Sequence, residues 1–74
     1  MTQEKTNQIY YMVACINDCA ARWGISSAEA YQYLSDHGGI AFLMDCYEAE
    51  HLLSMDDAID DLALVCRNNG GSRA

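Results

Sequence analysis

The residues in this 74-residue sequence with the widest chemical range are four cysteines and two histidines. Cys15 and Cys19 are one helical turn apart, and Cys46 with a histidine would complete a metal or thiol redox site. Structural zinc sites favour close cysteine pairs at tight turns, and none of these cysteines adjoins a glycine turn. A free thiol on an apolar helix face packs as a small hydrophobe. We therefore expect no metal and no cofactor, and keep a small metal-binding or thiol redox protein as the alternative.

Nucleophilic catalysis would need a thiolate beside a base in an electropositive pocket. Cys46 and His51 are the nearest such pair in the sequence, but a separation of five residues places them on different sides of a helix. Acid–base catalysis by carboxylates such as Glu48 and Glu50 needs a cleft that shifts their pKa, and short helices offer little cleft. We predict that the protein is not an enzyme.

The charge balance excludes several partners. Eleven Asp and Glu against four Lys and Arg give a formal charge of −7 and a pI near 4.3. Nucleic acids and anionic membranes bind through Lys and Arg, so neither is expected as a partner. The longest apolar run, residues 9–16, is too short to span a membrane. Residues 1–5 do not resemble an export signal, so we expect a cytoplasmic protein.

Apolar residues recur at helical spacing along the whole chain, and no alternating run indicates a strand. The sequence predicts an all-α fold, a small antiparallel bundle of four short helices in a single domain spanning residues 1–74. Glycines end the first, second and last of these helices or follow them closely. The predicted helices span residues 6–23, 27–37, 40–52 and 55–67, with a frayed tail at 70–74.

Two helix starts carry the same signal. Ser26 with Glu29, and Ser54 with Asp57, each place a capping hydroxyl three residues before an acid. The serine oxygen accepts the backbone N–H of the acid, whose carboxylate in turn accepts the N–H of the serine. We therefore predict two matched capping boxes.

The predicted helix at 40–52 has apolar residues on two sides, so we expect it to lie centrally in the bundle or to touch a second chain. The sequence leaves open which of the two apolar sides packs in the core and which forms an interface. Tyrosine is favoured at interfaces, and five tyrosines exceed what so small a core can hide. By helical phase Tyr31 and Tyr47 are predicted to face inward, whereas Tyr10, Tyr11 and Tyr33 are predicted to be exposed.

The run Gly39-Ile40-Ala41-Phe42-Leu43-Met44-Asp45-Cys46-Tyr47-Glu48-Ala49-Glu50-His51, with the acid-rich segment 54–62 and the helix start at 26–31, resembles a family of short bacterial proteins of unknown function, numbered 3791. The resemblance covers nearly the whole chain. It implies small, mostly helical cytosolic proteins, some of them encoded beside a protein resembling ADP-ribosyltransferases in the manner of toxin and antitoxin pairs. It implies no catalytic residue.

The sequence thus predicts a non-enzymatic protein–protein interaction module. The resemblance points to an antitoxin-like or accessory partner of a neighbouring gene product, and self-association into a homo-oligomer is a further expectation. An acidic run on the last helix would serve as a solvated face or as a docking surface for a basic partner. The candidate partner-binding residues are Tyr10, Tyr11, Tyr33, Tyr47, His51, Asp56, Asp57, Asp60 and Asp61.

Overall fold

The computed structural model describes residues 3–72, with side chains from residue 6 onward, and it confirms the all-α fold. The end of the predicted tail, residues 73–74, lies outside the described residues. No helix in the described part is both long and apolar enough to cross a membrane. The helices are α1 (Gln3–Trp23), α2 (Ser27–Asp36), α3 (Gly39–Asp45), α4 (Tyr47–Glu50) and α5 (Met55–Asn68).

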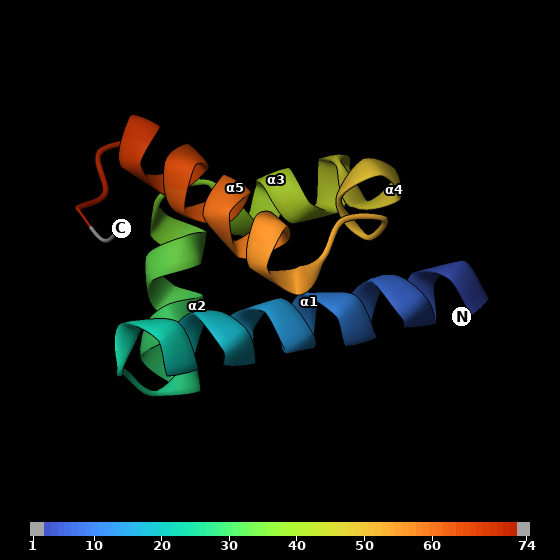
Figure 1. Ribbon diagram of the computed structural model, residues 1–74, viewed down its shortest axis with the longest axis horizontal. Coiled ribbons are helices and arrows are strands. Elements are labelled where there is room, and N and C mark those ends of the chain that lie inside the picture. The colour runs from blue at the N-terminus through green and yellow to red at the C-terminus, as the bar shows by residue number, and fades with distance from the viewer. Residues whose placement is uncertain (1–2, 73–74) are drawn as a thin grey trace.

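The long helix α1 forms one side of the molecule, and the other helices pack along it (Figure 1). Helix α2 runs steeply across the C-terminal end of α1, while α5 lies above its middle and contacts α1, α2 and α3. Helix α4 lies at the opposite end, toward the N-terminus of α1. The core lies where these helices converge.

Both predicted helix starts are present, but they differ in completeness. At α2 the Ser26 oxygen accepts the Glu29 backbone N–H at 3.1 Å, and Glu29 Oε1 accepts the Ser26 N–H at 3.3 Å. At α5 Ser54 accepts the Asp57 N–H at 3.2 Å, and no bond from the Asp57 side chain back to Ser54 is found in the described residues. Asp is one methylene shorter than Glu, so its carboxylate falls short of the cap nitrogen. The prediction of two matched boxes is correct for the first and half correct for the second.

The prediction of one helix over residues 40–52 is wrong, because the chain bends at Cys46 and divides it into α3 and α4. Cys46 has φ −110° and ψ 16°, outside helical geometry. Its N–H still bonds the Phe42 carbonyl at 2.9 Å, and its own carbonyl accepts the Glu50 N–H at 2.8 Å. The bend therefore costs few hydrogen bonds, and it brings the ring of Tyr47 edge-on to Tyr11 of α1, with centroids 5.6 Å apart.

The core is built from leucine, alanine, isoleucine and cysteine. Cys15, Cys19 and Cys66 are fully buried, as their apolar surroundings in the sequence predict, and Cys46 is half-buried. Gly39, the first residue of α3, allows α3 to lie close to α2 and α5, since a Cβ there would lie 2.8 Å from Leu34 Cδ2 and 3.1 Å from Cys66 Sγ. The largest fully buried side chains besides the cysteines are Leu34, Leu43, Ile59 and Leu62.

The tyrosines correct the prediction from helical phase in three cases. Tyr31 is 48% exposed rather than inward, whereas Tyr10 is 70% exposed, as predicted. Tyr11 and Tyr33 are half-buried against the core instead of exposed. The Tyr33 ring packs edge-on to Trp23 with centroids 5.3 Å apart, and Tyr11 packs against α4. Neighbouring helices thus bury sides of α1 and α2 that the apolar pattern of each helix, taken alone, predicts to be exposed.

Candidate functional site

The most unusual interior feature is a buried carboxyl on α4. The Glu50 side chain is 6% exposed, and its Oε1 has no hydrogen-bond partner among the described residues. A hydrogen bond joins its side chain to Asp61 of α5. Burial, followed by this bond and the charge of Asp61, raises the pKa of Glu50 to about 7. A carboxyl with a raised pKa holds its proton to higher pH than an exposed one, which allows Glu50 to be buried in its neutral form below that pH.

The α1 groups close to Glu50 are the Tyr11 hydroxyl and the Cys15 thiol, both protonated. Tyr11 Oη donates to the Glu50 carbonyl oxygen at 3.0 Å, tying α4 to α1. Burial and the nearby Cys15 raise the pKa of Tyr11 well above its usual value, and burial also raises the pKa of Cys15. The Cys15 thiol contacts Met55 Sδ at 3.8 Å. This cluster thus holds protons firmly and supplies neither a thiolate nor a phenolate.

The two other fully buried cysteines, Cys19 and Cys66, also have raised pKa values. Burial raises the pKa of Cys19 to about 12, and burial raises that of Cys66 as well. Thiols that stay protonated are poor nucleophiles and poor metal ligands. Within residues 3–72, no group of three or more His, Cys, Asp or Glu side chains is arranged to hold a metal ion. The structure therefore does not bring Cys15, Cys19, Cys46 and a histidine together as the alternative reading requires.

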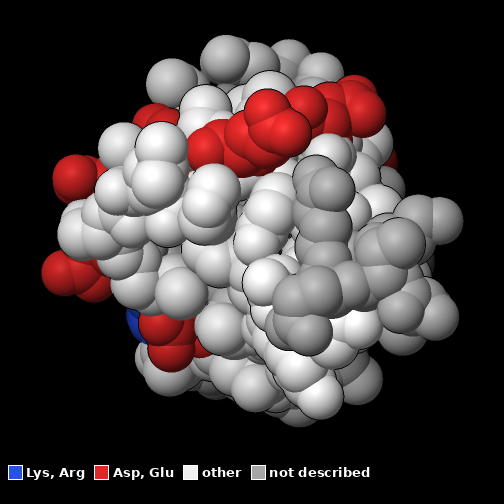
Figure 2. Space-filling model, turned by 90° about the vertical axis from the view of Figure 1, so that its right-hand side faces the viewer, with Lys and Arg blue, Asp and Glu red and all other residues white. Residues whose placement is uncertain are grey.

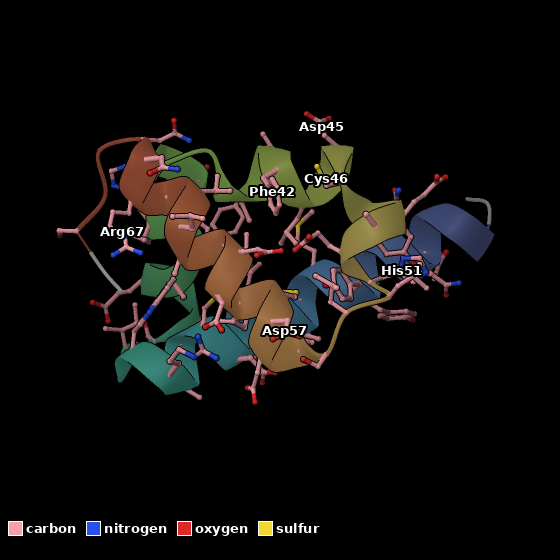
Figure 3. All side chains as sticks on the ribbon, turned by 45° about the horizontal axis from the view of Figure 1, so that its top comes forward. Phe42, Asp45, Cys46, His51, Asp57 and Arg67 are labelled. Atoms are coloured by element: carbon pink, nitrogen blue, oxygen red, sulfur yellow. The ribbon has the colours of Figure 1, made fainter. Side chains whose placement is uncertain are left out.

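Two predicted partner residues form a stacked pair at α4. The rings of Tyr47 and His51 are nearly parallel, at 12°, with centroids 4.5 Å apart. His51 Nδ1 lies 2.7 Å from the Tyr47 carbonyl oxygen, so the end of the short helix fixes the imidazole. His51 is exposed and Tyr47 is half-buried. Together they give this end of the molecule an aromatic edge. Figure 3 shows His51 at the end of α4.

Exposed leucines follow this pair directly. Leu52 is 78% exposed and Leu53 is 40% exposed, and the exposed acids Asp56 and Asp57 begin α5. Figure 2 shows that the described part of this end of the molecule is largely uncharged, with acidic side chains along its upper and left margins in that view. We call the following set the α4–α5 surface: His51, Leu52, Leu53, Asp56 and Asp57.

The predicted acidic run on α5 divides between two environments. Asp60 Oδ1 accepts from Arg22 of α1 at 2.6 Å, and Asp56 lies 3.5 Å from the same guanidinium. Asp57 is exposed, whereas Asp61 is half-buried and bonds Glu50. The four acids therefore do not make one uniform solvated face.

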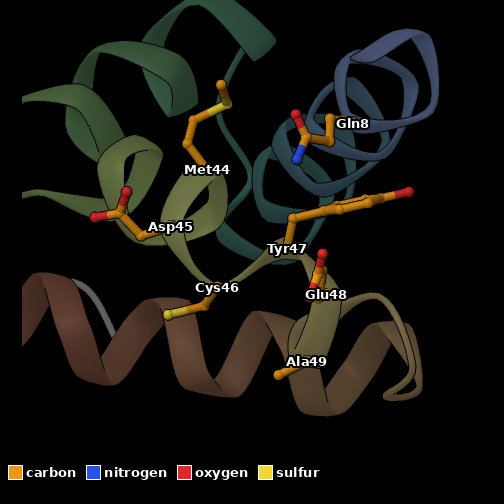
Figure 4. Close-up of a pocket in the computed structure, with 7 residues that line it drawn as sticks. All are labelled: Gln8, Met44, Asp45, Cys46, Tyr47, Glu48 and Ala49. Atoms are coloured by element: carbon orange, nitrogen blue, oxygen red, sulfur yellow. The ribbon is translucent and has the colours of Figure 1, made fainter. Parts of the chain in front are cut away.

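A hollow of about 370 Å³ lies between α1 and the α3–α4 bend (Figure 4). Gln8 of α1, Met44 of α3 and Tyr47 of α4 lie around it, and Glu48 is at its edge. Its lining is mixed polar and apolar and contains neither histidine nor a cation. Its chemistry singles out no ligand class.

Sequence reasoning missed the burial of Glu50. The sequence does contain a signal, because Glu50 lies three residues after Tyr47, which is predicted to face inward, and residues three apart share a helix face. Asp61 was counted with the acidic face because its neighbours in the sequence are acids. Its inward direction follows only from its position on α5 relative to the buried Leu62 and Ala58.

The family comparison identifies this chain. A model of the family described as "Protein of unknown function (DUF3791)" matches residues 10–69, most of the chain, so the protein belongs to that family. No curated protein and no solved structure matches the sequence.

Proposed function

We propose that this member of a family of unknown function is a non-enzymatic protein–protein interaction module that contacts its partner through the α4–α5 surface. The observation that carries the proposal is the exposure of large hydrophobic side chains, foremost Leu52 at 78%. Apolar side chains gathered at one surface mark interaction sites more often than chance. Among the residues whose side chains are described, the large hydrophobic ones exposed by 40% or more are Ile9, Tyr10, Val13, Tyr31, Met44, Leu52, Leu53 and Leu64.

The α4–α5 surface has the composition of a contact region. Leu52 and Leu53 supply apolar anchors, and the stacked Tyr47–His51 pair supplies rigid aromatic area at little cost in conformational entropy. Asp56 and Asp57 add negative potential at the edge, where charges steer association and select against like-charged partners. The complementary partner presents an apolar recess with Lys or Arg around it.

The partner we propose is the product of a neighbouring gene, a protein resembling ADP-ribosyltransferases, which this chain would serve as an antitoxin-like neutraliser or accessory subunit. Family resemblance motivates the choice of partner. The acidic edge beside exposed leucines supports a protein partner with a basic contact surface.

Co-expression with the neighbouring gene product, followed by affinity capture with the tag on either protein, tests the proposal. The wild type is expected to co-purify in both orders of tagging. The double variant Leu52→Ser with Leu53→Ser is expected to lose most of the captured partner. The matched control Leu64→Ser removes a leucine of similar exposure, 49%, from α5 and is expected to bind as the wild type does.

Two results would contradict the proposal. Absence of capture in both tagging orders would remove the proposed partner. Equal capture by the double variant and by the Leu64→Ser control would remove the α4–α5 surface as the contact region.

A further inference from the structure

The C-terminal end of α5 is joined to the end of α2 by two contacts between the same residues. Asn69 Nδ2 donates to the His37 carbonyl oxygen at 3.0 Å, and His37 Nδ1 lies 3.2 Å from the Asn69 carbonyl oxygen. A Cβ on Gly38 would lie 2.9 Å from Asn69 Nδ2, so the glycine leaves room for the amide. We call the two contacts between Asn69 and His37 the C-terminal clasp. This end of α5 lies at the opposite end of the molecule from α4 (Figure 1).

The residue that follows the clasp is a glycine. Asn69 and Gly70 form the one Asn–Gly pair in the sequence, and both residues are exposed. Asparagine is chemically labile because the backbone nitrogen of the next residue can attack its side-chain amide. Glycine favours this attack, since it has no side chain to shield its nitrogen. A Cβ built on Gly70 would meet no described residue within 4 Å beyond its chain neighbours, so the surroundings leave space for a ring to form.

The reaction is a deamidation that needs only water. The Gly70 backbone nitrogen attacks Asn69 Cγ, so that an N–Cγ bond forms while the Cγ–Nδ2 bond breaks. The proton of the Gly70 N–H leaves with Nδ2 as ammonia, and a succinimide ring remains in the main chain. Water then adds to one of the two ring carbonyls and opens the ring. One opening gives aspartate, and the other gives isoaspartate, in which the main chain passes through the side-chain carbon.

The folded chain restrains both reacting groups. The clasp holds the Asn69 amide toward His37, and the Gly70 N–H donates to the Arg67 carbonyl oxygen at 3.2 Å. Attack requires that both hydrogen bonds open. Helix ends open far more readily than the core, because few contacts have to be lost. The reaction is therefore expected in the folded protein through local opening of the end of α5, and at a lower rate than in the unfolded chain.

The product cannot restore the contact that was lost. A carboxylate only accepts hydrogen bonds, and the His37 carbonyl oxygen also only accepts, so two oxygens would face each other at the clasp. We propose that Asn69 is a site of spontaneous deamidation, that the C-terminal clasp restrains the reaction, and that conversion releases the end of α5 irreversibly. The inference goes beyond the proposed function, because it concerns the opposite end of the molecule and requires no partner.

Peptide mapping by mass spectrometry of the full chain, incubated in water labelled with a heavy oxygen isotope, tests the reaction. One sample is folded and the other is denatured in guanidinium chloride at the same pH. Asn69 is expected to lose its amide nitrogen and gain labelled oxygen in both samples, about ten to a hundred times more slowly in the folded chain. Asn7, Asn17 and Asn68 are expected to stay unconverted over the same period, because the residues after them carry side chains.

A variant of His37 tests the restraint. His37→Ala removes one half of the clasp and is expected to speed conversion of the folded chain about two- to tenfold, the equivalent of one hydrogen bond. In guanidinium chloride it is expected to react as the wild type does. The control Ser35→Ala changes an exposed residue of α2 and is expected to leave the rate unchanged in both samples. Asn69→Gln keeps a side-chain amide and is expected to stay unconverted, because its cyclisation needs a larger ring.

Asn69→Asp reproduces one product and tests the release of the end of α5. It is expected to lower the melting temperature by about 4–8 °C, the shift for loss of about one hydrogen bond in a domain of this size. The control Asn68→Asp adds the same charge one residue earlier and is expected to melt close to the wild type.

Equal rates in the folded and denatured samples would overturn the clasp as a restraint, as would a wild-type rate for folded His37→Ala. A folded chain with no conversion at Asn69 within the time set by an about hundredfold slower reaction would overturn the site itself. Equal melting temperatures for Asn69→Asp and Asn68→Asp would overturn the release.

Discussion

Glu50 and Leu52 are two residues apart, yet the carboxyl side chain is 6% exposed and the leucine is 78% exposed. This reverses the usual distribution, in which Glu is almost never fully buried. Inside the molecule, the raised pKa of Glu50 allows its carboxyl to be buried in the protonated form, which reduces the cost of burial. Outside it, nothing in the described residues offsets the cost of exposing Leu52. In this segment the burial of a side chain follows from the path of the backbone rather than from the polarity of the side chain. The exposed leucine is the feature that we attribute to function.

The turn after α4 explains why Glu50 is buried and Leu52 is exposed. The Tyr11 hydroxyl holds the Glu50 carbonyl, so the end of α4 is tied to α1. Bonds from Leu52 N to the Ala49 carbonyl, 3.3 Å, and from Leu53 N to the Glu50 carbonyl, 3.0 Å, close a tight turn immediately before the Ser54 cap. Because this short turn lies at the surface, the side chains of Leu52 and Leu53 do not reach the core.

The largest expected effect separates interior from exposed leucines. Leu34→Ala is expected to lower the free energy of unfolding by about 2–5 kcal/mol, because Leu34 is fully buried. Leu52→Ala is expected to change it by less than about 0.5 kcal/mol. Chemical denaturation of both variants measures the difference. A large loss for Leu52→Ala would mean that the exposed leucine supports the fold, and the contrast would fail.

The next effect is a pH dependence from Glu50. Its pKa of about 7 in the folded protein lies above the ordinary value of 4.5, so the folded state binds the proton more tightly than the unfolded chain. The resulting stability is fully present below about pH 4.5 and is lost as the pH rises through 7. Denaturation at a series of pH values is expected to show a fall on the order of 3 kcal/mol across this window.

Glu50→Gln is the matched control for that titration. The amide keeps a donor for Asp61 and has no proton to lose, so the fall between pH 4.5 and 7 is expected to disappear. Persistence of the full slope in Glu50→Gln would show that another group causes it.

The smallest effect compares Asp60 with its neighbour Asp61. The Arg22–Asp60 pair is at the surface, where an ion pair contributes less than about 1 kcal/mol and is screened by salt. Asp60→Asn is expected to cost little and to leave the pH dependence intact, whereas Asp61→Asn is expected to shift the titration of Glu50 to lower pH. Thermal melts at low and high salt and across pH distinguish the two variants.

Much of the fold could be predicted from local chemistry. The capping serines mark the starts of α2 and α5, and the apolar setting of Cys15, Cys19 and Cys66 predicts their burial. The bend at Cys46 could not be predicted, because it keeps the hydrogen bonds of a helix and is fixed by Tyr47 packing on a helix 36 residues earlier, at Tyr11.

The candidate site was less predictable. Tyr10 and His51 are exposed, whereas Tyr11 bonds α4 and Asp61 interacts with Glu50. Leu52 and Leu53 were assigned to a helix and its boundary, and nothing in their types signals exposure. The exposure of Leu52 and Leu53 is set by the position of the turn relative to the core.

Calorimetric titration of the neighbouring gene product into this protein tests the central claim most directly. The exposed leucines of the α4–α5 surface are expected to carry the contact. Leu52→Ser with Leu53→Ser should therefore weaken binding by at least about tenfold relative to Leu64→Ser, with the free energy of unfolding nearly unchanged. Equal affinity for the double variant and for Leu64→Ser would contradict the account.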